Sequence, residues 1–153
     1  MNKKIIVIIG VIAILILLSV FVVKPKNNDI ANHSNPENAG ATVSKVEVFL
    51  FHATQRCPTC VRIGQLAKAT VEERFSEQLK SGKIEFREIN IDLPENKDLA
   101  EKFQAGGSAL FINVIRDGQD NIKEDTMVWQ LASGNVDKFK DYLSNRINTI
   151  LGI

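Results

Sequence analysis

The residues best suited to chemistry in this 153-residue chain are its two cysteines, Cys57 and Cys60. Only two residues separate them, so a disulfide between them would close a very short loop. Cross-linking stabilises a protein mainly by restricting its unfolded chain, and this effect grows with the length of the closed loop. We therefore expect the pair to carry out redox or binding chemistry and not to serve as a structural staple.

The cysteines belong to the segment Arg56-Cys57-Pro58-Thr59-Cys60, which lies between a predicted strand and a predicted helix. At a helix N-terminus, unpaired backbone N–H groups and the helix dipole favour a thiolate, and Arg56 adds a positive charge next to Cys57. Cys60, one turn into the helix, is close enough to attack a mixed disulfide formed at Cys57. We predict that Cys57 is the exposed nucleophile and that Cys60 is the more buried resolving thiol. Pro58 and Thr59 are candidates to tune the pair or to contact substrate.

The first half of the globular stretch alternates between strand and helix patterns. Val46–Phe51 is β-branched and aromatic, which is typical of a central buried strand. From Pro58 onward, apolar residues recur with a period of 3.6 and predict one helix that ends at Ser81-Gly82, where glycine supplies a left-handed cap. The alternation of Ile84–Ile91 predicts the second strand. The predicted buried face of the helix consists of Ile63, Leu66, Thr70, Val71, Phe75 and Leu79.

The second half contains another helix, a hairpin and a closing helix. Asp92-Leu93-Pro94-Glu95 starts the helix, because a proline in the first turn loses no hydrogen bond. The apolar run Ala109–Ile115 predicts a buried strand, and the residue types of Asp117–Asn121 are typical of a hairpin turn. We predict that Thr126–Leu131 is the returning antiparallel strand. The inward residues of the two helices are Leu99, Ala100 and Phe103 in the first, and Val136, Phe139, Leu143, Ile147 and Ile150 in the second.

The predicted order β-α-β-α-β-β-α defines an α/β domain over residues 45–153. Strand–helix–strand units imply parallel pairing, and the last two strands are expected to form an antiparallel hairpin. We therefore predict a four-stranded mixed sheet flanked by helices on both faces. This architecture is that of a thioredoxin-like fold.

An uncharged apolar run, residues 5–23, follows a short N-terminal tail at residues 1–4. As a helix it would span roughly 28 Å, close to the hydrocarbon thickness of a bilayer. The run is longer than the apolar part of a secretory signal peptide, and no small-residue cleavage site follows it. We predict a single-pass anchor in the cell membrane and then a flexible polar linker at residues 24–44. Because so short a tail stays in the cytoplasm easily, we expect the domain on the extracytoplasmic, periplasmic side.

Composition and ligand counts limit the possible functions. The net charge of +1 gives no electrostatic reason to expect a nucleic-acid partner. No G-x-G-x-x-G follows a strand, so we expect no flavin or nicotinamide and no cofactor beyond a reversible Cys57–Cys60 disulfide. A structural zinc site needs four ligands, and His33 and His52 are the only histidines beside the two cysteines. Three interpretations stay open: a thiol–disulfide oxidoreductase, a thiolate module that binds Cu(I) or As(III), and a scaffold that only binds.

Residues 46–153 resemble the thioredoxin superfamily and, more narrowly, the bacterial family of the nitrophenyl compound nitroreductase subunit ArsF. The narrower resemblance is carried by Phe51-His52-Ala53-Thr54, by Arg56 with Cys57 and Cys60, by Ile89-Asn90-Ile91-Asp92 and by Leu99-Ala100-Glu101-Lys102-Phe103. The resemblance implies a membrane-anchored oxidoreductase that relays electrons between protein thiols and disulfides. A transmembrane thiol transporter is the electron donor that this class suggests. The chain offers no site for the nitroreductase chemistry in the family's name.

Two positions depart from the pattern of ordinary thioredoxins. A cis-proline usually precedes the third strand, but here Gly107 or Ser108 occupies that place. We expect a trans peptide there, because a cis bond is costly at a non-proline residue. The buried acid near the end of the first strand is replaced by Phe51. His52 follows directly and is a candidate to tune the cysteines, and Ser108 is a candidate to contact substrate.

Overall fold

The sheet at the centre of the protein is mixed and four-stranded, as the sequence predicts. The structure, a computed structural model, describes residues 42–153. Its strands are β1 (Val43–His52), β2 (Ile84–Asn90), β3 (Ala109–Arg116) and β4 (Ile122–Glu124), in the order β2-β1-β3-β4. The predicted tail, membrane anchor and most of the predicted linker lie outside the described residues. Within residues 42–153, no helix combines the length and the apolar composition needed to cross a membrane.

The strand directions follow from the lengths of the connections. β1 is parallel to β2, as expected, but β3 is antiparallel to β1, which corrects the expectation of parallel pairing for every strand–helix–strand unit. Helix α4 (Lys97–Phe103) has only 7 residues, and a helix of that length spans only about 10 Å, too short to carry the chain back along the sheet. β3 therefore starts at the end where β2 stops, and Ala109 pairs with Phe51.

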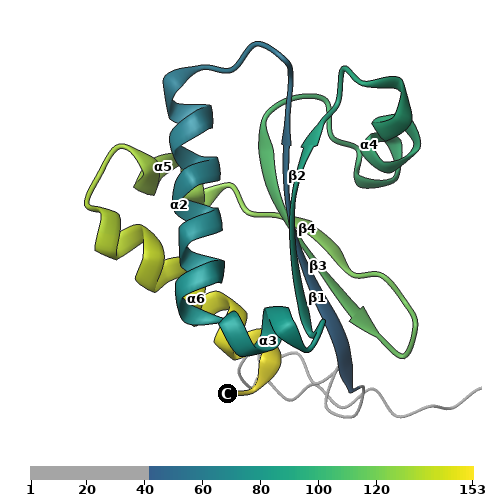
Figure 1. Ribbon diagram of the computed structural model, residues 1–153, viewed down its shortest axis with the longest axis vertical. Coiled ribbons are helices and arrows are strands. Elements are labelled where there is room, and N and C mark those ends of the chain that lie inside the picture. The colour runs from purple at the N-terminus through teal and green to yellow at the C-terminus, as the bar shows by residue number, and fades with distance from the viewer. Residues whose placement is uncertain (1–41) are drawn as a thin grey trace, which may run out of the picture. The chain divides into compact units, whose positions relative to one another are not determined.

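Helices cover both faces of the sheet (Figure 1). Helices α2 (Pro58–Arg74), α5 (Met127–Ala132) and α6 (Val136–Leu151) lie on one face, and α4, preceded by the 3₁₀ helix η1 (Pro94–Asn96), lies on the other. Successive residues of a strand point to opposite faces. Accordingly, Val46, Val48 and Leu50 pack into the core under α2 and α6, whereas Phe49 and Phe51 pack into an aromatic core with α4.

The long helix predicted from Pro58 is broken at Phe75. Helix α2 ends at Arg74, and a second helix, α3 (Ser76–Lys80), follows it. Phe75 leaves the helical conformation, with a φ of −132°, and its side chain is only 2 % exposed. The chain therefore turns at the residue that inserts its ring into the core. The predicted glycine cap is confirmed, because Gly82 follows α3 with a φ of +73°.

The prediction that Thr126–Leu131 is a strand is wrong. Asp117 and Gly118 both have positive φ, so the hairpin turns within two residues and the returning strand begins at once. That strand is β4, in which Ile122 pairs with Asn113. The segment predicted as a strand forms helix α5 instead, which buries Val128 and Ala132 completely. These two residues are one helical turn apart, so one face of α5 packs on the core.

Helix α6 confirms the predicted closing helix and supplies two partners of the buried carboxylate of Asp125. Asn135 caps its N-terminus by accepting hydrogen bonds from the N–H groups of Asp137 and Lys138. The Tyr142 hydroxyl donates to Asp125, at 2.9 Å from Oδ1, and Asp125 is only 3 % exposed. Nε of Arg146 lies 2.9 Å from Oδ2 of the same carboxylate. Burial, together with the bond to Asp125, raises the pKa of Tyr142 from 10.0 to about 12.

We predict that the phenol of Tyr142 ionises near pH 12 in the native protein. Tyr142 is the only tyrosine of the chain, so the phenolate absorbance reports this group alone. Because the folded pKa lies above the unfolded one, the stability that this group contributes is complete below about pH 10 and is lost between pH 10 and 12. Asp125→Asn should lower the midpoint. A native midpoint near pH 10, with the far-ultraviolet circular dichroism unchanged, would contradict the assignment.

Candidate functional site

Cys57 and Cys60 form a disulfide at the N-terminus of α2, with Cys57 in the N-cap position and Cys60 in the first turn of the helix. Their Cα atoms are 5.1 Å apart. Cys57 is exposed, whereas Cys60 is only 8 % exposed. The disulfide thus presents one sulfur-bearing residue to the solvent and keeps the other within the protein, which is the difference in exposure that the sequence predicts.

The sulfur of Cys57 caps helix α2. Its Sγ accepts a hydrogen bond from the backbone N–H of Cys60 at 3.1 Å, where an oxygen of serine or aspartate commonly serves. Pro58 takes the first helical position, where a missing N–H costs nothing. The first turn contains no acidic residue. After reduction, the same N–H and the helix dipole favour a thiolate at Cys57. Thr59 is exposed beside the pair.

Arg56 contacts both α2 and β2, and neither contact was predicted from the sequence. Nη1 of Arg56 lies 3.1 Å from Oε2 of Glu88 in β2, and Nη2 donates to the Cys60 carbonyl oxygen at 3.4 Å. The positive charge expected next to Cys57 is therefore partly neutralised by Glu88. The side chain is 20 % exposed and joins the neighbouring strand to the first turn of the helix.

Gly64 makes this arrangement of Arg56 possible. A Cβ atom at Gly64 would lie 2.8 Å from Nη2 of Arg56 and 2.5 Å from Cδ2 of Leu50. Both distances are below van der Waals contact, so a larger residue at position 64 would force the side chain of Leu50 or Arg56 to move. This role could not be predicted from the sequence, because a glycine inside a helical pattern indicates a packing constraint without identifying the residues that impose it.

His52 and its neighbours fasten the loop that leads to the cysteines. His52 ends β1 opposite Asn90 of β2, and its Nδ1 lies 2.9 Å from the Ala53 carbonyl oxygen. The Thr54 N–H donates to Oδ2 of Asp92 at 2.7 Å, and the Asn90 amide donates to Oγ1 of Thr54 at 3.0 Å. The hydrogen bonds from Thr54, with a smaller effect of His52, lower the pKa of Asp92. The sequence contained a signal for this cluster, because polar residues stand at the ends of two adjacent parallel strands.

The loop that contains Ser108 lies at the same end of the sheet as the disulfide loop. Ser108 directly precedes Ala109, which pairs with Phe51 at the end of β1. All peptide bonds of residues 42–153 are trans, including the one between Gly107 and Ser108, as expected. Ser108 is half-buried, and within the described part of the chain no hydrogen bond joins it to the cysteines.

The two β1 side chains compared with the buried acid are apolar, one on each face of the sheet. Phe51, at the position compared with the buried acid, is fully buried against Phe103 and Phe111 on the α4 face. The β1 residue that faces α2 is Leu50. Since both residues are hydrocarbon, no carboxylate of β1 reaches the cysteines from either position.

Fold and site together define a mixed-sheet α/β protein with an exposed disulfide at the N-terminus of the first helix after a central strand. Among solved structures, this chain is similar to a thioredoxin from Thermus thermophilus, with 17 % identity, a TM-score of 0.43, and 67 % of this chain and 74 % of that one covered. A thioredoxin-like protein from Clostridium perfringens has 15 % identity and a TM-score of 0.42, with 68 % and 72 % covered. Fasciola hepatica thioredoxin has 20 % identity and a TM-score of 0.40, with 67 % and 82 % covered. No protein-family model and no curated protein matches the chain, and the narrower ArsF resemblance is not confirmed.

We predict that Gly64→Ala destabilises the oxidised protein even though alanine is the better helix former. Alanine gains about 1 kcal/mol over glycine in a helix, whereas overpacking a core costs about 1–3 kcal/mol. The free energy of unfolding in urea should therefore fall by about 1 kcal/mol. Gln65→Ala, on the exposed side of the same turn, is the matched control and should leave stability unchanged or slightly higher. A Gly64→Ala protein as stable as the control would show that the contact with Leu50 and Arg56 relaxes freely.

Proposed function

We propose that the protein is a thiol–disulfide oxidoreductase that exchanges electron pairs with other proteins. The observation that carries the proposal is the position of Cys57: exposed, capping α2 with its sulfur, and bonded to the buried Cys60. The mixed four-stranded sheet with helices on both faces also agrees with the architecture predicted for a thioredoxin-like fold.

The chemistry needs only the cysteine pair and a partner protein. A partner thiolate attacks Sγ of Cys57, the Cys57–Cys60 bond breaks, and Cys60 leaves as a thiolate that takes up a proton. A second partner thiol, as its thiolate, then attacks the partner sulfur of the mixed disulfide and releases the Cys57 thiolate. The partner loses two electrons and gains a disulfide, and the cysteine pair gains the two electrons. The reverse sequence reduces a partner disulfide, with Cys60 resolving the intermediate.

The surroundings of the disulfide divide into contact and positioning residues. Pro58 and Thr59 lie beside Cys57, and the loops that contain His52 and Ser108 belong to the same end of the sheet, so these four residues are candidates to contact a partner protein. Arg56 acts through Cys60 and Glu88 and is a positioning residue.

An exchange assay on the full chain tests this proposal. We expect the protein to accelerate the reduction of insulin by dithiothreitol, and Cys57→Ser to remove the acceleration. Cys60→Ser should accumulate a mixed disulfide with insulin at Cys57, visible as a mass adduct that dithiothreitol removes, because the resolving thiol is gone. Cys57→Ser is the matched control and should form no such adduct.

The same proteins distinguish the thiolate-binding alternative. If the wild type neither reduces insulin nor forms the adduct, yet binds one equivalent of Cu(I) or As(III) tightly, the exchange proposal fails and the cysteines form a metal or metalloid site. Unchanged insulin reduction by Cys57→Ser would also overturn it.

Membrane anchoring through residues 5–23 is part of the same proposal, with an extracytoplasmic domain and a transmembrane thiol transporter as the electron donor. The support is the uncharged apolar run itself. The described domain fits such a tether, because β1 begins at Val43, at the end of the sheet opposite the disulfide loop. Cys57 would then lie at the end of the domain away from the point where the chain enters it.

We predict that a membrane-impermeant maleimide labels Cys57 in intact spheroplasts after mild reduction. The chain has no other cysteine besides Cys60, so no reporter needs to be introduced. The protein should also stay in the membrane pellet after alkaline carbonate extraction. The double variant Cys57→Ser/Cys60→Ser is the labelling control. Labelling only after lysis would reverse the proposed orientation, and release by carbonate would exclude the anchor.

A further inference from the structure

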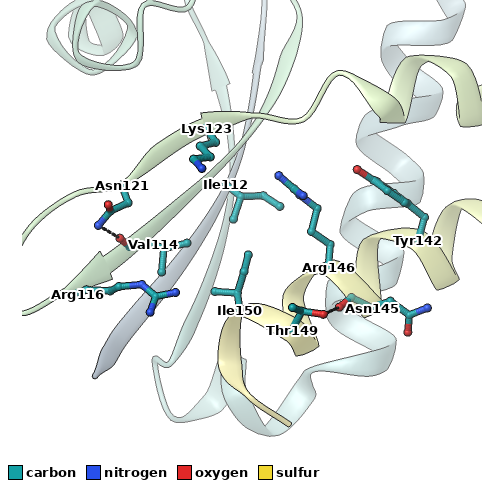
Figure 2. A pocket seen from close by; sticks show the side chains of 10 residues that line it. All are labelled: Ile112, Val114, Arg116, Asn121, Lys123, Tyr142, Asn145, Arg146, Thr149 and Ile150. Carbon is teal, nitrogen blue, oxygen red and sulfur yellow. Dashed lines mark hydrogen bonds between the residues drawn. The ribbon is translucent and has the colours of Figure 1, made fainter. Parts of the chain in front are cut away.

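A second candidate site lies far from the disulfide, between β3, β4 and α6 (Figure 2). The cavity has a volume of about 530 Å³, within the range of roughly 300–1,000 Å³ that is typical of small-molecule sites. One of its lining residues, Arg116, pairs with Val43 at the start of β1. Cys57 follows the other end of that strand. The cavity therefore reaches the end of the sheet opposite the disulfide, and it extends to Ile112 and Lys123, which lie level with the middle of β1.

The lining of the cavity combines an apolar wall with positive charge. Ile112 and Val114 of β3 and Ile150 of α6 supply the hydrocarbon. Arg116, Lys123 and Arg146 supply three cations, and no acidic residue lines the cavity. Figure 2 shows that these cationic side chains come from three different elements, around the apolar residues.

The cations of this cavity are incompletely paired. Arg146 contacts Asp125, at 2.9 Å. Within residues 42–153, neither Arg116 nor Lys123 has an ion-pair partner. The side-chain amide of Asn121, which also lines the cavity, donates a hydrogen bond to the Val114 carbonyl oxygen and carries no negative charge. Arg116 and Lys123 therefore leave positive charge beside the apolar wall that a bound anion can pair with.

We propose that this cavity binds a small organic anion: a carboxylate, sulfonate or phosphate carried on an aromatic or aliphatic body. Arg116 and Lys123 contact the anionic group, because Arg146 is already engaged by Asp125. Ile112, Val114 and Ile150 contact the body. None of the residues that line the cavity belongs to the loop or the helix turn that carries Cys57 and Cys60, so the proposed binding uses other side chains than the cysteine chemistry.

Tyr142 supplies a direct probe, since it lines the cavity and is the only tyrosine of the chain. The full chain, labelled with 3-fluorotyrosine and held in phosphatidylcholine discs, is titrated with 2-naphthoate and followed by fluorine resonance. We expect a saturable shift with naphthoate and at least tenfold weaker binding of the neutral 2-naphthalenemethanol, because charge-assisted hydrogen bonds are lost. Discs that contain phosphatidylglycerol test a lipid source: if they reproduce the shift without naphthoate, the anion is a lipid headgroup.

Two kinds of variant decide the outcome. Arg116→Gln/Lys123→Gln should weaken the response at least tenfold, whereas Lys80→Gln/Lys138→Gln, which removes two exposed lysines elsewhere, should leave it unchanged. Thr149→Phe fills the cavity without changing its charge and should abolish the response. Circular dichroism and an intact Cys57–Cys60 disulfide verify folding of each variant. The proposal would be overturned if neither 2-naphthoate nor phosphatidylglycerol shifts the resonance. It would also be overturned if the shift survives both Arg116→Gln/Lys123→Gln and Thr149→Phe.

Discussion

The N-terminus of helix α2 is the point on which the rest of the candidate redox site depends. The Cys60 N–H donates to Sγ of Cys57, so the helix begins at the reactive sulfur itself. Gly64 lets the helix approach Leu50 of β1, and Arg56 joins its first turn to Glu88 of β2. The disulfide is thus held by its own cap, by the sheet beneath it and by the neighbouring strand. An exposed cysteine can react with a partner protein while its geometry stays fixed by buried contacts.

A second constraint, the short connection from β2 to β3, gathers the remaining loops at the same end. Because α4 cannot return the chain along the sheet, β3 begins where β2 stops and runs antiparallel to β1. The loop before Ala109 therefore lies at the end of the sheet that carries Thr54, Asp92 and the cysteines. The aromatic cluster of Phe49, Phe51, Phe103 and Phe111 fastens α4 to this end, since each ring pairs with another at 5.2–5.7 Å.

Local sequence patterns predicted most of this arrangement, and the failures show where local patterns stop being informative. The first three strands, the start of α2 and the different exposure of Cys57 and Cys60 follow from hydrophobic periodicity and the helix-start signal. The segment Thr126–Leu131 was misassigned because its five apolar or β-branched residues suit either a strand or one face of a helix, and only the tight turn at Asp117 and Gly118 decides. The ion pair of Arg56 with Glu88 joins elements that are distant in sequence, so no local pattern could have revealed it.

The two ends of the sheet therefore present different chemistry. One end carries the disulfide with its exposed Cys57, and a hydrocarbon-lined cavity extends from Lys123, level with the middle of β1, to Arg116 at the other end. Arg116 pairs with the first residue of β1, and the 10 residues of that strand span about 30 Å, which is several times the screening length of charges in physiological salt. Arg116 consequently has little direct effect on a thiolate at Cys57. A ligand in the cavity would leave the disulfide free to meet a partner protein, so the two proposed sites can operate without competing for the same surface.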